Sequence, residues 1–183
     1  EEFGFSMIGT GPGETGSQLS RDNILRALES IAQLLGSHSG TSPTLSAVLD
    51  ILERELGMLR STVLLLSADG SELLVQALRD PLQPEHEAIR YRKGEGIVGR
   101  VLESGIPAMI PRISEEPQFG DRIHRRREAG MDHLGFVCVP IMLGNEIIGT
   151  LAADLKCDKS ESLADARQVL SIVASMIATM LST

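Results

Sequence analysis

Apolar residues recur every three or four positions along two early stretches of the chain, the spacing that one face of an α-helix requires. Ser20 precedes the first stretch as an N-cap and Gly36 follows it as a stop, while Ser42-Pro43 and Gly57 bracket the second. The predicted apolar faces are Ile24, Leu28, Ile31 and Leu35 in the first helix, and Leu45, Val48, Leu49, Leu52 and Leu56 in the second. The sequence therefore predicts two helices before any strand.

Beyond Gly57 the apolar period changes from helical spacing to the alternation typical of strands. The predicted order is a hairpin over 62–78 that turns at Asp69-Gly70, a short strand over 89–92, a short helix within 94–105, a strand over 108–113, an irregular polar stretch over 114–132, a hairpin over 136–154, and a last helix capped by Ser162 with Asp165 three residues on. Hairpin-linked strands between helices at both ends predict an α+β fold with an antiparallel sheet, one face of which the terminal helices cover.

Length and composition narrow the class of protein. The 183 residues suffice for one domain, and 42% hydrophobic with 23% charged residues is ordinary globular composition. We expect a flexible leader over residues 1–19, where glycines surround Pro12, and one domain over 20–183. The net charge of −8 disfavours contact with nucleic acid or an anionic membrane.

The length of the apolar runs and the number of cysteines indicate where in the cell the protein is expected. We find no apolar run that approaches the roughly 20 residues of a membrane span, so we expect a soluble protein. Two cysteines, Cys138 and Cys157, give neither a disulfide framework nor a zinc site, and we expect a reducing cytoplasm.

One segment, Gly94-Glu95-Gly96-Ile97-Val98-Gly99, matches the G-x-G-x-x-G pattern of dinucleotide-binding proteins. That pattern binds a pyrophosphate when it lies between a buried parallel strand and a crossover helix. Here the preceding residues 90–93 are polar, and the later strands are joined by hairpins. We therefore interpret the glycines as a tight turn that opens a short helix lying close against the sheet.

Residues 122–127 form the one basic cluster of this acidic chain. One interpretation is a solvated helix face; the alternative is that one or two of its arginines meet an anionic ligand or partner. His124 and His133 lack the spacing of a helical metal site, so no metal ligand is predicted. Cys138 alternates with Phe136 in an apolar strand without a local base, and is interpreted as a buried cysteine rather than a catalytic nucleophile.

The last helix carries more apolar surface than packing on a sheet requires. Its main seam is Leu163, Ala166, Leu170, Val173, Ile177 and Met180, and a second stripe runs through Val169, Ile172 and Met176. Two interpretations stay open: the terminal helices pack against each other within one subunit, or they form a helical bundle with a second copy. In the second case we expect a homodimer in which a change at the ligand site tilts or turns the last helix.

Three segments of the sequence resemble GAF domains. Residues 91–102 are similar to the family's Y-x-x-G-E-G-x-x-G-x-V element, residues 111–122 to its next segment, and residues 136–141 with 148–151 to its paired strands. Over about residues 20–181 the sequence looks most like the N-terminal GAF domains of NifA-type, sigma-54-dependent activators of nitrogen-fixation genes. The resemblance implies a central sheet of five or six strands, N- and C-terminal helices on one face, and a ligand pocket under loops on the other.

The resemblance also implies a role. In that family such a domain senses a small molecule or a nitrogen-signalling protein, and controls an AAA+ ATPase module and a DNA-binding module that this chain does not contain. It implies a cytoplasmic domain for transcription regulation that is not an enzyme and that binds no nucleic acid or membrane itself. Some relatives bind 2-oxoglutarate, which is the effector we consider here. The family's cysteine cluster, cyclic-nucleotide signature and chromophore cysteine are missing or incomplete, so no cofactor is assigned.

A ligand is expected between the sheet and residues 113–133, because this irregular polar stretch has no packing periodicity. An acidic metabolite needs arginine to pair with its carboxylates. The candidate lining residues are Tyr91, Arg112, Phe119, Arg122, His133 and Phe136. Two alternatives stay open: a free-standing enzyme of the methionine-sulfoxide reductase type, with Cys138 as its candidate thiol, and a dimerisation scaffold with a vestigial pocket.

Overall fold

The structure is a computed structural model, and it describes residues 19–37, 40–79, 90–119, 126–127, 130–157 and 160–182. The predicted leader, apart from Leu19, lies outside these residues, as do Arg122 and His124.

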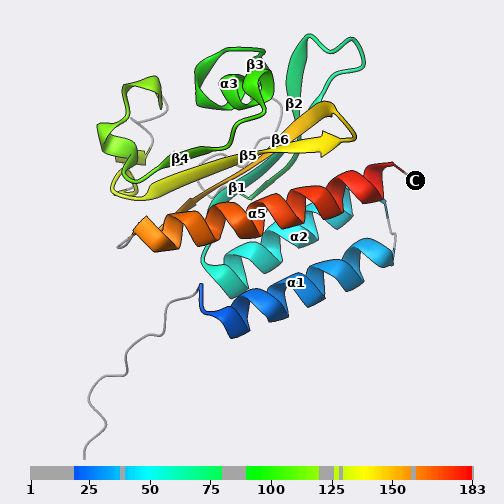
Figure 1. The fold of residues 1–183 in the computed structure, drawn as a ribbon, viewed down its shortest axis with the longest axis horizontal. Helices are drawn as coiled ribbons and strands as arrows, with labels where there is room; N and C mark the ends of the chain where they lie inside the picture. The colour runs from blue at the N-terminus through cyan, green and yellow to red at the C-terminus, as the bar shows by residue number, and fades with distance from the viewer. Residues whose placement is uncertain are drawn as a thin grey trace, which may run out of the picture.

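The elements follow the predicted order, and Figure 1 shows a sheet with the long helices on one side of it. In chain order they are α1 (Arg21–Gly36), α2 (Thr41–Leu56), β1 (Leu59–Leu66), β2 (Glu72–Arg79), β3 (Arg90–Arg92), α3 (Gly96–Ser104), β4 (Ala108–Ile110), the 3₁₀ turns η2 (Ile113–Glu115) and η3 (Pro117–Phe119), β5 (Gly135–Leu143), β6 (Glu146–Leu155) and α5 (Ser160–Leu181). The six strands of the described sheet pair only with antiparallel neighbours, in the order β3-β2-β1-β6-β5-β4. The predicted α+β class with an antiparallel sheet is confirmed.

Two predicted helix starts are wrong. The N-cap of α2 is Gly40, so Ser42 and Pro43 lie in the first turn, where the N–H that proline lacks has no helical partner in any case. Helix α5 begins at Ser160, so Ser162 is a first-turn residue and not the cap.

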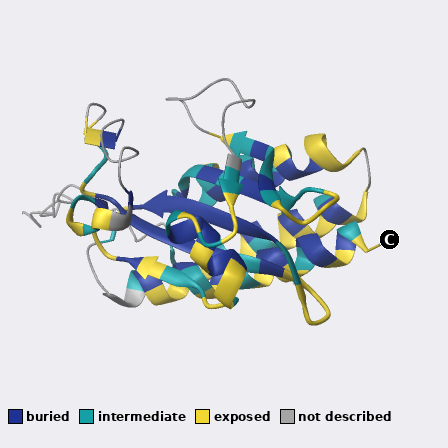
Figure 2. Ribbon diagram, turned by 90° about the horizontal axis from the view of Figure 1, so that it is seen from above, coloured by how far each residue is buried: buried dark blue, intermediate teal, exposed yellow. Residues whose placement is uncertain are grey.

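The larger hydrophobic core lies between the sheet and the long helices. Helices α2 and α5 pack on the sheet, and α1 packs on those two helices as a further layer. Figure 2 shows buried residues along the strands and on the inner faces of the helices. All six residues of the predicted seam of α5 are buried in this core: Leu163, Ala166, Leu170, Val173, Ile177 and Met180. The seam therefore packs within one subunit.

The second predicted stripe on α5 divides between core and surface. Val169 is buried and Met176 is half-buried, whereas 41% of Ile172 is exposed. On α1 the exposed large apolar side chain is Leu25, at 55%.

Helix α5 also corrects the expectation about membrane spans. Its stretch Ser162–Leu181 has the length and mean hydropathy, 1.2, that a membrane-crossing helix needs. Half of that stretch is buried inside the domain, as in the core helix of a globular protein.

A smaller hydrophobic core covers the opposite face of the sheet, beneath α3 and η3. The glycines at the start of α3 form the predicted turn: the Gly94 N–H donates to the Gly99 carbonyl over 2.9 Å, and Gly94 has φ 81°. A Cβ on Gly99 would lie 2.6 Å from the backbone oxygen of Arg92, so this position requires glycine. The interpretation as a tight turn that brings a short helix close to the sheet is confirmed.

Strand β4 lies at one edge of the sheet and is shorter than predicted, ending at Ile110. Pro111 follows it and cannot continue the ladder, because proline has no N–H to donate. The chain then turns through η2 and η3 over the smaller core.

Candidate functional site

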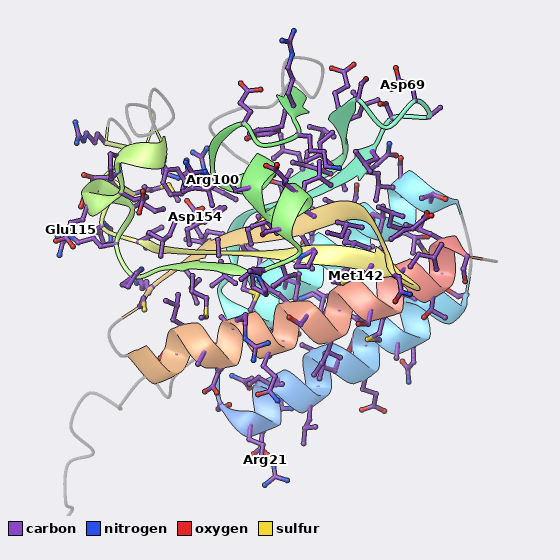
Figure 3. All side chains as sticks on the ribbon, turned by 45° about the horizontal axis from the view of Figure 1, so that its top comes forward. Arg21, Asp69, Arg100, Glu115, Met142 and Asp154 are labelled. Carbon is purple, nitrogen blue, oxygen red and sulfur yellow. The ribbon has the colours of Figure 1, made fainter. Side chains whose placement is uncertain are left out.

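A buried carboxylate marks the candidate site. Asp154 lies near the end of β6 and pairs in register with Phe136 of β5. It is fully buried, and Figure 3 shows it on the side of the sheet away from the long helices. Burying an ionised carboxylate is unfavourable unless it is paired and hydrogen-bonded, so its partners define the site.

The main partner of Asp154 is Arg126. Its Nε donates to Oδ2 over 2.8 Å and its Nη2 to Oδ1 over 3.1 Å, a two-pronged contact in which both residues are buried. The guanidinium carbon of Arg126 also lies 4.9 Å from the ring centre of Phe119. Phe119 in turn meets Phe136 edge to face, with ring centres 5.0 Å apart.

A second arginine approaches the same carboxylate. Nε of Arg60 lies 3.7 Å from Oδ2 of Asp154, and 8% of the Arg60 side chain is exposed. Arg60 has φ 49°, a left-handed conformation that is uncommon for residues other than glycine. It lies where the β1–β6 register shifts between Leu59 and Thr62. This irregularity in β1 places the Arg60 guanidinium beside Asp154.

We name these five residues, Arg60, Phe119, Arg126, Phe136 and Asp154, the Asp154 site. It brings two guanidiniums and one carboxylate together beside two aromatic rings, away from water. Charged groups interact more strongly in such surroundings than at a surface, and removing one partner of a buried pair costs about 3–5 kcal/mol. An arginine fork of this kind recognises planar carboxylates.

The predicted lining residues are divided by the structure. Phe119 and Phe136 are brought into contact at the Asp154 site. Tyr91 is half-buried on β3, the strand at the other edge of the sheet from β4, and packs against the same smaller core. Arg112 and His133 are exposed; Nε of Arg112 donates to the Ser114 hydroxyl over 3.2 Å. Arg122 lies outside the described residues.

Three residues of the site were not predicted, although two left a signal in the sequence. Asp154 is the one charged residue between Ile147 and Leu155 of its strand and alternates with Ala152, which places both on one face. Arg126 belongs to the basic cluster, but it is buried and so does not belong to a solvated face, and the anion that it meets is the chain's own Asp154 and not a ligand or partner. Arg60 left no such signal in the sequence, because its position beside Asp154 depends on the irregular backbone of β1 at this residue.

Cys138 lies on β5 and is fully buried. Burial raises the pKa of its thiol to about 12, an effect that the Thr150 hydroxyl partly offsets. The thiol is therefore protonated at neutral pH, in accord with its interpretation as a buried strand cysteine.

A cavity of about 500 Å³ opens elsewhere, at the C-terminal end of α2. Its lining residues are Asp50, Glu53, Arg54, Gly57, Leu59, Arg79 and Lys156. Arg79 pairs with both acidic residues, and Nη1 of Arg54 lies 3.0 Å from Asp50. These pairs are well exposed, so each contributes little and the cavity offers no buried recognition group.

The sequence matches curated proteins along most of its length. It is 32% identical over 167 residues to the nitrogen fixation protein VnfA of Azotobacter vinelandii, covering 90% of this chain and 32% of that protein. It is 34% identical over 163 residues to the Nif-specific regulatory protein of Azotobacter vinelandii, covering 86% of this chain and 30% of that protein. The Nif-specific regulatory protein of Azospirillum brasilense is 35% identical over 149 residues, and the match covers 81% of this chain and 23% of that protein. The chain thus spans about a quarter to a third of the length of these relatives.

Solved structures show the same fold at lower identity. The GAF domain of A. aeolicus nlh2 in an inactive state superimposes with a TM-score of 0.79 at 21% identity, covering 87% of this chain and 96% of that one. A free methionine-R-sulfoxide reductase from Neisseria meningitidis superimposes with a TM-score of 0.64 at 16% identity, covering 90% and 95%. At such identities the likeness concerns the fold alone. The family model described as "GAF domain" matches residues 41–181. Six antiparallel strands, long helices on one face and a match over most of the chain lead to one conclusion: this chain belongs to the GAF domain family.

Proposed function

We propose that the chain is the signal-sensing regulatory domain of a NifA-like bacterial transcriptional activator. In this role it binds a small molecule or a nitrogen-signalling protein in the cytoplasm, and it controls ATPase and DNA-binding modules outside this chain. The observation that carries the proposal is the pattern of coverage. Two relatives named as Nif-specific regulatory proteins match 81% and 86% of this chain, the nitrogen fixation protein VnfA matches 90%, and all three extend well beyond it.

The Asp154 site supports an acidic ligand. The planar fork of Arg126 already binds one carboxylate there, that of Asp154, and Phe119 packs against its guanidinium, so an acidic ligand would take the place of the Asp154 carboxylate. We therefore propose Arg126, in place of the predicted Arg112 and Arg122, as the arginine that binds the ligand beside Phe119 and Phe136. Among acidic metabolites we propose 2-oxoglutarate as the first to test.

The test combines two measurements on the purified chain. Native mass spectrometry of freshly purified protein detects a retained small molecule, and calorimetric titration with 2-oxoglutarate measures its binding directly. Binding that Arg126→Gln abolishes and the exposed neighbour Arg127→Gln preserves is the expected result. Absence of both heat and a thermal shift at millimolar 2-oxoglutarate refutes this choice of ligand.

We also propose that the domain acts as a homodimer through α1 and α5. Because the main seam of α5 is buried within one subunit, the contact must use the outer surfaces of the two helices, where Leu25 and Ile172 are exposed. Sedimentation of the chain as a monomer at tens of micromolar contradicts the proposal.

The alternative of a methionine-sulfoxide reductase has less support. Such an enzyme needs a reactive thiolate, and the pKa of Cys138 is raised to about 12. Turnover of free methionine sulfoxide that Cys138→Ser abolishes would favour the enzyme over the sensor.

A further inference from the structure

We propose that the outer edge of β4, the side away from β5, is an interaction surface that pairs with β4 of a second copy of this chain. The two strands pair antiparallel about a two-fold axis, so the two sheets join edge to edge. This contact is separate from the one proposed through α1 and α5, and it needs no ligand.

The described sheet has two edges, and β3 forms the one that is closed to a further strand. The Arg92 N–H donates to the Glu95 carboxylate over 3.0 Å, and the Arg92 carbonyl accepts from the Glu95 N–H over 3.0 Å. A strand arriving at this edge would find these backbone groups already bonded. Residues 90–93 also include three basic side chains, and charges on an edge strand discourage pairing with another strand.

Strand β4 forms the other edge and is open. In the described sheet it pairs with β5 alone, and Figure 1 shows it at the outside of the sheet. Residues 105–111 carry no charge, Ile106 is exposed, and 46% of Met109 is exposed. Pro107 and Pro111 flank the strand, and because proline has no N–H to donate, they confine an added ladder to β4 itself. The edge is therefore open, apolar and short.

A second copy of the chain is the partner that fits this edge. Each copy carries a net charge of −8, so two copies approach most easily where both surfaces are uncharged, as they are here. A two-fold contact is self-complementary: with the axis at Met109, each Met109 meets its counterpart, and Ala108 lies opposite Ile110. The same register brings Ile106 near Arg112 of the other copy, whose methylene groups can cover it.

The small size of the contact sets its strength. Stable interfaces bury at least about 1,200 Å² in total, and three paired residues supply only part of that area. We therefore expect weak, reversible association. Because the contact is apolar and the two copies carry charge of the same sign, added salt should strengthen it by screening the repulsion, whereas it would weaken a contact held by ion pairs.

Sedimentation velocity from tens of micromolar to the millimolar range measures this association. Met109→Lys should weaken it at least about tenfold, because two like charges would then lie opposite each other on the axis. Met142→Lys is the matched control: 43% of Met142 is exposed, and it lies near the end of β5, beyond the residues that pair with β4. The control should leave the association unchanged.

A cross-link tests the register of the two strands. Residues directly opposite each other on antiparallel strands have Cα atoms about 4.5–5.5 Å apart, which is within the range of a disulfide. Cys157→Ser removes the half-buried native thiol from the background. In that background a mild copper oxidant should join Met109→Cys chains into a covalent dimer, and should leave Met142→Cys chains as monomers.

Three results would overturn the proposal. The first is a chain that stays monomeric up to the millimolar range. The second is association that Met109→Lys leaves unchanged or that both lysine variants weaken equally. The third is association that added salt weakens. Should Met109→Lys fail to fold, the cross-link decides: a covalent dimer from Met109→Cys alone supports the β4 contact, and equal cross-linking of both cysteine variants, or none, refutes it.

Discussion

Shortening Leu170 to alanine tests how α5 is used in this domain. Leu170 lies on the main seam of the helix and is fully buried in the core between α5 and the sheet. Deleting a buried leucine side chain loses its burial and leaves a cavity, which together cost about 2–5 kcal/mol. Since Leu170 has no exposed surface, we expect about 3 kcal/mol, a large part of the 5–15 kcal/mol typical of a domain. For a domain of this size that corresponds to a melting temperature lower by about 6–12 °C.

The matched control is Ile172→Ala, two residues further along the same helix. Because 41% of Ile172 is exposed, its truncation should cost less than about 1 kcal/mol of stability. Urea denaturation followed by circular dichroism gives the loss of stability for both variants. Sedimentation velocity of both variants gives their state of association.

The two measurements separate the two uses of the helix. If the seam packs within one subunit, Leu170→Ala lowers the urea midpoint and leaves the sedimentation coefficient unchanged. A Leu170→Ala variant with an unchanged urea midpoint and weaker association refutes the reasoning, because the seam would then face a second copy. If Ile172→Ala alone weakens association, the proposed homodimer uses the outer surface of α5.

Two further predictions follow from close packing and burial. Gly149→Ala should prevent folding or lower stability by more than about 3 kcal/mol, because the added Cβ would lie 2.1 Å from the carbonyl oxygen of Leu64. The control is Gly36→Ala, whose added Cβ would have no atom within 4 Å. In the same urea assay this control should be neutral or stabilise the domain by at most about 1 kcal/mol. At pH 8 iodoacetamide should modify the half-buried Cys157 first and leave Cys138 intact, as peptide mapping would show. Folding raises the pKa of Cys138 from 9.0 to about 12, so between these pH values the unfolded chain releases the thiol proton that the folded chain keeps. The contribution of this thiol to stability is therefore present below pH 9 and is lost as the pH rises toward 12. Cys138→Ala should flatten the decline of the urea midpoint over that range.

Local signals predicted most of the fold. Ser20 caps α1 by accepting from the Asn23 N–H over 3.2 Å, and the Asp69-Gly70 turn joins β1 to β2 with Gly70 at φ 73°. Such signals involve residues within a few positions of each other, so sequence alone carries them. The wrong start of α2 has the same origin: local preference ranks Ser42 above Gly40 as an N-cap residue, whereas the helix begins after Gly40.

The Asp154 site was predicted only in part, because it depends on contacts between distant segments. Arg126 and Asp154 are 28 residues apart, and the pairing exists only after β6 and the segment beyond β4 have been brought together. A lone aspartate in an apolar strand was a usable signal that the chain must supply a cation for it. The left-handed backbone of Arg60 had no such signal, because no glycine or asparagine marks the position.

The backbone at position 60 sets conformational strain against charge pairing. Glycine adopts a φ of 49° without strain, whereas a residue with a side chain carries about 1 kcal/mol or more of conformational energy there. Arg60→Gly would relieve that energy, but it would also remove one of the two guanidiniums beside the buried Asp154, a loss that costs about 3–5 kcal/mol. A directed-evolution campaign for heat resistance would therefore retain the arginine, because the loss of the charge exceeds the relief of the backbone.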